Sequence, residues 1–240
     1  MSSKLIGILF LVLVPLFIIG MIGAFIYNIV SGKKGEQEII AFARSNNWEY
    51  FKNQNAELEQ LLSNTLYLVE KERAKRKISN IIKGNFRGIN FWYAFYKSPG
   101  RNNMPNRDLT FSRNWNIFVV PVNYSGERFM IFNAKKIPEL FSVEKLIQLT
   151  GHKLSKPEQS ELQDYYSDNI KSINDLKLSS RQLEQLNTVL SKTHSVHFFN
   201  HLLIYAVEKS TLLNPDEMKE HLENIKILVS LINSVSTEHN

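Results

Sequence analysis

The chain has 240 residues, a formal net charge of +6 at pH 7 and no cysteine. The lack of cysteine excludes a disulfide scaffold, a zinc ribbon, a thiol nucleophile and an iron–sulfur site, so only His, Asp and Glu side chains remain as metal ligands. The length falls between one and two average domains, and it allows one sizeable core or two small cores that share an interface.

The first 32 residues predict a transmembrane anchor. Leu5 to Gly32 is a run of 28 residues without a charge, and its first 22 residues end at Ile26. As a helix those 22 residues would span about 33 Å, against a hydrocarbon core of about 30 Å. Pro15 would kink the helix, which membrane helices tolerate. A cleaved signal peptide fits less well, because its apolar region is usually about 7 to 15 residues long. We therefore expect an uncleaved single-pass anchor over residues 1–32.

Basic residues beside this segment predict its orientation. Lys4 lies on the amino side, whereas Lys33, Lys34 and Arg44 follow on the carboxyl side. The positive-inside bias counts such residues within about 15 to 20 positions of the membrane. The excess favours a cytoplasmic location for the 208 residues that follow the segment. The opposite, periplasmic orientation stays open because the difference in charge is small.

Charge is unevenly distributed over the soluble part. Between Lys71 and Arg113 there are 11 basic and two acidic residues, whereas from Pro138 onward there are 10 basic and 14 acidic residues. We therefore divide the soluble part into a basic half, residues 33–138, and a mildly acidic half, residues 139–240. No Gly/Ser/Pro-rich linker separates the halves, so we expect one compact domain.

The basic half is predicted to contain two short helices followed by an antiparallel meander. Helical apolar spacing and period-two alternation assign the expected helices to Glu36–Asn46 and Ala56–Leu62, and the expected strands to Lys77–Lys83, Ile89–Lys97, Leu109–Val120 and Arg128–Asn133. Gly84–Gly88 has the composition of a hairpin turn. Ile89–Lys97 is apolar on both faces, which is typical of a central strand. In Leu109–Val120 the face with Asn114 and Asn116 is expected to meet solvent.

The acidic half is predicted to mix helices with two strands, which makes the fold class α+β with an antiparallel sheet. The expected elements are a helix over Ser142–Thr150, a partly extended crossover over His152–Asn174, a helix over Ser179–Lys192, strands over Val196–Phe199 and Leu202–Val207, and a long final helix. The final helix has Asn214 as N-cap and Pro215 at its first position. Its apolar stripe is expected to pack onto the sheet of the same chain; the stripe comprises Met218, Leu222, Ile225, Val229 and Ile232.

Short motifs along most of the chain resemble a known arrangement. They are Ala41-Phe42-Ala43-Arg44 before Trp48-Glu49-Tyr50, Ile81 to Gly88, and Leu203-Ile204-Tyr205 followed by Asn214-Pro215-Asp216-Glu217. With the membrane segment, they are similar to a loose group of uncharacterised bacterial single-pass membrane-anchored proteins. The resemblance implies an α+β domain and a location at the bacterial inner membrane. It implies no activity, so no catalytic residue is carried over.

Three histidines are one candidate for a metal site. His194, His197 and His201 follow the spacing i, i+3, i+7, which would place three imidazoles on one face of a helix. The residues between them have strand composition, and on a strand the first two histidines would face opposite sides. We therefore expect no metal and no cofactor.

A group of acidic residues offers a second possible site. Paired carboxylates serve glycoside hydrolysis and metal binding, and the group comprises Glu158, Glu161, Asp164 and Asp168, with Tyr165 and Tyr166 beside them. Such residues are mostly solvated, and we expect a solvated crossover. Gly84–Gly88 lacks the residues of a phosphate loop, and no G-x-S-x-G or H-E-x-x-H motif occurs.

The basic stretch is the feature that best indicates a function. For a domain tethered to a bilayer, each basic residue near anionic headgroups contributes about 1 kcal/mol of binding. The expected lipid- or partner-binding residues are Lys71, Arg73, Lys75, Arg76 and Lys77. The aromatic residues nearby resemble those of single-strand nucleic-acid binders, but we assign them to the sheet core and regard nucleic acid as an improbable partner.

The leading hypothesis is a non-enzymatic, membrane-anchored interaction or assembly domain that faces the cytoplasm and has a protein partner. The alternatives are a periplasmic-facing binding domain on the same anchor, and a membrane-bound metal-dependent hydrolase. Gly20 and Ala24 form a small-x-x-x-small pair that lets two membrane helices approach closely. We therefore also expect weak homo-oligomerisation through the anchor.

Overall fold

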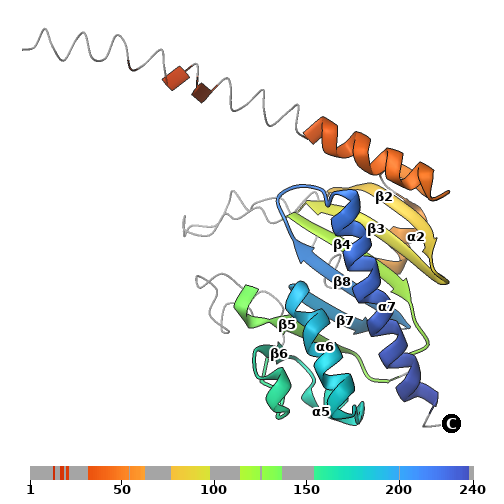
Figure 1. Cartoon of the computed structure of the whole chain (residues 1–240), viewed down its shortest axis with the longest axis vertical. Helices are drawn as coiled ribbons and strands as arrows, with labels where there is room; N and C mark the ends of the chain where they lie inside the picture. Colours follow the sequence, from red (N-terminus) through yellow and green to blue (C-terminus); the bar gives the residue numbers. More distant parts are fainter. Residues whose placement is uncertain are drawn as a thin grey trace, which may run out of the picture.

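Figure 1 shows the computed structural model of the chain. The residues it describes are 13, 17–18, 20–21, 32–53, 55–62, 77–97, 114–124, 126–136, 154–199 and 201–237. Most of the predicted membrane segment therefore lies outside the described residues, as do the predicted helix Ser142–Thr150 and the domain boundary at residue 138. In the part of the chain that is described, no helix combines the length and the apolar character needed to cross a membrane.

The described residues form one eight-stranded antiparallel sheet with helices on both faces, which confirms the α+β class. The strands are β1 (Glu49–Asn53), β2 (Lys77–Phe86), β3 (Ile89–Lys97), β4 (Asn114–Pro121), β5 (Phe129–Asn133), β6 (Tyr165–Ser167), β7 (Ser195–Phe199) and β8 (Leu202–Glu208). The labelled helices are α2 (Ala56–Leu62), α5 (Ile170–Asp175), α6 (Ser180–Lys192) and α7 (Pro215–Thr237), with 3-10 turns η2 (Ala134–Lys136) and η3 (Ser160–Leu162). A further helix over residues 32–45, here called the junction helix, follows the predicted membrane segment.

The strand order is β1-β2-β3-β4-β8-β7-β5-β6. Strands β2 to β4 form the expected meander, and β1, which was not predicted, pairs with β2. The prediction that β5 continues the meander was wrong. The free edge of β4 pairs with β8 over seven residue pairs, from Trp115 opposite Glu208 to Pro121 opposite Leu202. Strand β5 instead lies between β7 and β6. Both halves of the soluble part therefore contribute strands to the same sheet.

The hairpin between β2 and β3 turns later than predicted. Arg87 and Gly88 have φ of 49° and 89°, as a two-residue type I′ turn requires. Gly84 belongs to the ladder, opposite Phe91. A Cβ atom at Gly84 would lie 2.6 Å from the ring of Trp48. Gly84 therefore allows the close approach of the Trp48 ring. The sequence did not reveal this role, because the residues around Gly84 have the composition of a turn.

Helices cover the two faces of the sheet unequally. In Figure 1, α7 runs along the near face with α6 beside it and the junction helix at one end, and α2 lies behind the sheet. The stripe of α7 packs on its own sheet as expected, with Met218, Leu222, Ile225 and Ile232 buried and Val229 partly buried. Strand β3 is buried on both faces, which confirms its central place.

Reciprocal capping boxes start the two long helices. The Ser179 hydroxyl accepts from the backbone N–H of Gln182, whose side chain in turn accepts from Ser179 N–H. Asn214 Oδ1 accepts from Glu217 N–H at 2.9 Å, and the Glu217 carboxylate accepts from Asn214 N–H at the same distance. Each box satisfies backbone donors that have no partner within the helix. The predicted N-cap Asn214 is therefore confirmed, and the helix predicted over Ser179–Lys192 begins one residue later with Ser179 as its N-cap.

Asn116 is fully buried, so the expectation that its face of β4 meets solvent was wrong. Its Oδ1 accepts from the Tyr93 hydroxyl at 2.6 Å and from Leu213 N–H at 3.2 Å. Its Nδ2 donates to the carbonyl of Thr211 at 3.1 Å. The Asn116 side chain thus satisfies backbone groups of the loop between β8 and α7 that water cannot reach. This is why a polar side chain is stable at this buried position.

Replacing Asn116 tests this role. Asn116→Ala leaves the Tyr93 hydroxyl, Leu213 N–H and Thr211 carbonyl without their partner, and we expect it to lower the free energy of unfolding by roughly 2 to 3 kcal/mol. Tyr93→Phe removes one of these bonds and should cost about 1 kcal/mol. Urea unfolding followed by tryptophan fluorescence measures both. Equal losses would mean that the loop contacts contribute nothing.

Candidate functional site

The junction helix is part of the folded core. Ile39 and Ala43 are fully buried and Phe42 is 7% exposed. The Phe42 ring meets Trp48 edge-on at 5.2 Å between centroids, and Trp48 meets Phe91 of β3 in the same way at 4.9 Å. The chain therefore leaves the predicted membrane segment on a helix that is packed against the sheet.

Polar contacts attach the same helix to the first two strands. The Glu36 carboxylate forms an ion pair with Lys52 of β1 at 3.0 Å and accepts a hydrogen bond from the Tyr50 hydroxyl at 3.4 Å. That hydroxyl also lies 2.7 Å from Asn80 Oδ1. Asn80 has φ of 53° at an irregularity in β2. Burial, followed by the charge of Glu36, raises the pKa of Tyr50 to about 12, so this tyrosine is neutral and donates.

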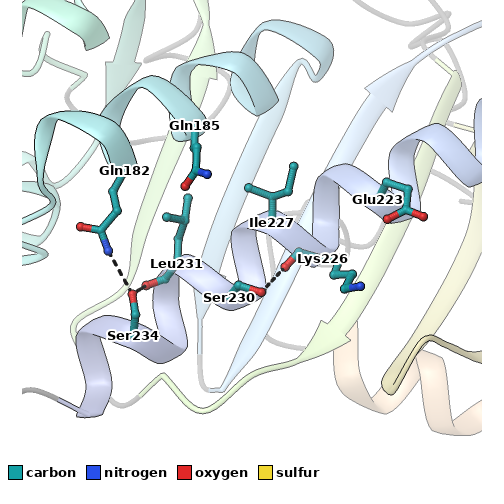
Figure 2. A pocket seen from close by; sticks show the side chains of 8 residues that line it. All are labelled: Gln182, Gln185, Glu223, Lys226, Ile227, Ser230, Leu231 and Ser234. Carbon is teal, nitrogen blue, oxygen red and sulfur yellow. Dashed lines mark hydrogen bonds between the residues drawn. The ribbon is translucent and has the colours of Figure 1, made fainter.

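Helices α6 and α7 form an antiparallel pair with an open groove between them. Lys192 at the end of α6 pairs with Glu220 near the start of α7 at 3.1 Å. At the opposite ends, Gln182 Nε2 donates to Ser234 Oγ at 3.2 Å. Figure 2 shows the groove, which has a volume of about 490 Å³ and is lined by Gln182, Gln185, Glu223, Lys226, Ile227, Ser230, Leu231 and Ser234.

The chemistry of this groove suits contacts rather than catalysis. Its lining offers amide and hydroxyl groups, and the carboxylate of Glu223 is paired with Arg87. The hydroxyls of Ser230 and Ser234 bond to carbonyls of their own helix at 2.9 Å and 2.7 Å. Ile227 is 37% exposed, and among the residues described from 32 onward it is the one large apolar side chain that is exposed.

A polar cluster interrupts the core beneath the first half of α7. The Tyr205 hydroxyl of β8 lies 3.0 Å from His221 Nδ1, with the two side chains 0% and 8% exposed. Burial lowers the pKa of His221 to about 4, with Glu220 opposing the shift and Lys136 adding to it. Burial also lowers the pKa of Lys136 and raises the pKa of Tyr205. At neutral pH the imidazole and the phenol are both uncharged.

This cluster was not predicted from the sequence, although the sequence contains a signal for it. His221 lies three residues after Met218 and four before Ile225, on the face of α7 that carries the apolar stripe. A polar residue at such a position is buried and needs a partner. The partner, Tyr205, comes from a strand 16 residues earlier, and helical spacing does not identify it.

The residues predicted to bind lipid or a partner lie at the margin of the described chain. Lys71, Arg73, Lys75 and Arg76 fall outside it, and Lys77 is described only through its backbone, opposite Lys97 in the β2–β3 ladder. Gly20 is helical, with nothing within 4 Å of an added Cβ, and Ala24 lies outside the described residues. The predicted basic site and membrane contact therefore remain predictions.

The three candidate histidines lie on or beside the predicted strands. His194 Nδ1 accepts from Glu208 N–H at 3.1 Å, and its ring meets Trp115 edge-on. His197 is buried in β7 with its ring near Phe132, and His201 is exposed in the turn before β8 with φ of 62°. Within the described ranges, no three His, Asp or Glu side chains are grouped so that they could hold a metal ion.

Three of the four acidic residues of the crossover have separate partners, and Glu158 is exposed. Asp164 pairs with Lys135, and Glu161 accepts from the Ser160 hydroxyl at 2.9 Å. Asp168 is the exception to the expected solvated face, because its side chain is 5% exposed and accepts from Met130 N–H at 2.7 Å. This carboxylate therefore holds β5 beside β6 and is used for structure.

Comparisons with known proteins leave the class of this protein open. No family model matches the sequence, and no curated protein matches it at a significant level. The crystal structure of the mycobacterial trehalose monomycolate transport factor A, TtfA, matches with a TM-score of 0.47 and 10% sequence identity, over 82% of this chain and 93% of that chain. A likeness this distant carries no argument about function.

Two residues of α7, Ile225 and Ile227, test whether the side chains of the groove contribute to the stability of the fold. Ile227 is exposed in the groove, whereas Ile225 is fully buried on the sheet. We expect Ile227→Glu to change the free energy of unfolding by less than about 0.5 kcal/mol. Ile225→Glu buries a charge and should cost more than about 4 kcal/mol. A large loss for Ile227→Glu in urea unfolding would show that the groove is part of the core.

Proposed function

We propose that this protein is a membrane-tethered interaction or assembly domain, located at the bacterial inner membrane with its soluble part in the cytoplasm. The observation that supports it is the burial of Ile39, Phe42 and Ala43 in the main core. A tether joined to the sheet through a packed helix would hold one side of the domain toward the bilayer. In this proposal the basic stretch from Lys71 to Lys77 faces anionic lipid or an acidic partner.

The described residues offer more support for contacts than for catalysis. His194, Asp164 and Asp168 have separate structural partners. The groove between α6 and α7 is lined by amide, hydroxyl, apolar and charged side chains. The periplasmic alternative shares the same anchor and differs only in orientation. Because the chain has no cysteine, a single cysteine at exposed Arg181, labelled in intact cells with an impermeant reagent, separates the two. Labelling would contradict the cytoplasmic assignment.

Lipid binding by the basic stretch is the first prediction of this proposal. The fragment from Lys33 onward should float with vesicles that contain anionic lipid and be released as salt rises, because the attraction decays over about 8 Å at physiological ionic strength. Replacing Arg73, Lys75, Arg76 and Lys77 with Gln should weaken flotation. If the four changes have no effect, or neutral vesicles bind equally well, the basic stretch does not face lipid.

A matched variant controls for net charge. It carries four Lys/Arg→Gln changes at exposed positions of the acidic half, namely Lys156, Lys171, Lys177 and Arg181. Both variants have the same net charge, so a local basic surface predicts weak flotation for the first variant alone. Equal weakening of the two would mean that overall charge, and no particular surface, drives the binding.

A further inference from the structure

His221 is packed against several different elements. Its imidazole lies on Tyr205 of β8, with ring centroids 5.5 Å apart, and near Phe118 of β4 at 6.2 Å. Both aromatic residues are fully buried, and the histidine itself is 8% exposed. Among the buried apolar side chains that join the first half of α7 to the sheet there is therefore an imidazole that bulk water barely reaches.

Protonation of this imidazole would change its hydrogen bonding. In the neutral state, the Tyr205 hydroxyl can donate to an unprotonated Nδ1 across their 3.0 Å separation. In the protonated state both ring nitrogens are donors, so the hydroxyl must accept from Nδ1 and direct its own hydrogen elsewhere. Thr193 also lies beside this hydroxyl, and because its own hydroxyl donates toward the carbonyls of Ser195 and Ala206 its lone pairs can accept that hydrogen, so the main cost of protonation is the buried charge.

The charged groups around the His221 ring do not compensate for the positive charge of a protonated imidazole. Lys136 of η2 and Lys192 of α6 both act against a protonated imidazole, whereas Glu217 and Glu220 of α7 favour it. Each carboxylate, however, has its own lysine: Glu217 pairs with Lys209, and Glu220 pairs with Lys192. Asn224 also faces this cluster, beside the Tyr205 hydroxyl, and is uncharged.

We propose that His221 is a pH-sensitive lock, whose neutral imidazole holds the first half of α7 on the sheet and whose protonation releases that half before the rest of the sheet opens. Release would uncover the apolar side chains of Met218, Leu222 and Ile225. It would also separate Lys219 from the Phe42 ring of the junction helix, which lies 5.5 Å away. The lock would therefore connect acidity to the end of the fold that the predicted anchor enters.

Hydrogen exchange measured by mass spectrometry on the full 240-residue chain in detergent tests the lock. Labelling times are scaled for the slower intrinsic exchange at acid pH, so that protection factors at pH 7.5 and pH 5.0 can be compared. A released imidazole with the ordinary pKa of 6.5 and a docked one with a pKa of about 4 predict about a 30-fold fall in protection for the first half of α7. The β2–β3 hairpin, whose backbone hydrogen bonds lie within the sheet, should keep its protection.

The direction of the pH effect on docking follows from the lowered pKa of His221. The docked state binds fewer protons than the released state between pH 6.5 and about 4, so docking is strongest above this range and weakens as pH falls through it. His221→Gln keeps a hydrogen-bonding group near Tyr205 but cannot titrate, and its α7 should be equally protected at both pH values.

Three results would overturn the proposal. They are unchanged α7 protection in the wild type at pH 5.0, an equal fall in α7 and in the β2–β3 hairpin, and the same acid response in His221→Gln. The first two use only the wild-type chain, so they decide the matter even if the variant does not fold. A histidine NMR titration on the wild type gives a further check, because a His221 pKa near 6.5 in the folded state would remove the basis of the lock.

Discussion

The pairing of β4 with β8 is the contact on which the rest of the structure depends. It joins strands that are about 90 residues apart through seven residue pairs, and the entropy lost in closing such a loop must be recovered by burial around it. The recovery is visible in Phe118 and Tyr205, which face each other across the pair and are fully buried. Asn116, two positions before Phe118, then fixes the loop that leads from β8 into α7.

This arrangement places the junction helix and α7 on the same face of the sheet. The junction helix and α7 share one apolar core, and their contact is reinforced by Lys219, which lies over Phe42. The ion pair between Arg87 and Glu223 adds a link from the β2–β3 turn to α7. Because such exposed ion pairs contribute little, the coupling between the tether end and α7 rests mainly on buried apolar contacts.

Local patterns in the sequence were sufficient for most elements and insufficient for their partners. Helical spacing gave Ala56–Leu62 with its observed bounds and located α6, and capping residues located the start of α7. Strand order was not predictable in this way, because the edge of β4 can accept either β5 or β8 and the choice depends on contacts distant in sequence. For the same reason the polar residues Asn116 and His221 were misread or missed: burial of each depends on a partner from another element.

The central claim is that the predicted tether enters the fold through a helix fixed to the sheet. It is tested most directly by the distance between spin labels at Ala41 of the junction helix and Thr188 of α6, both exposed, in the full chain in nanodiscs. The chain has no native cysteine, so the two introduced ones are labelled without interference. A packed junction helix predicts a single narrow distance distribution. A broad or multiple distribution would mean that the helix moves independently of the sheet, and it would contradict the account.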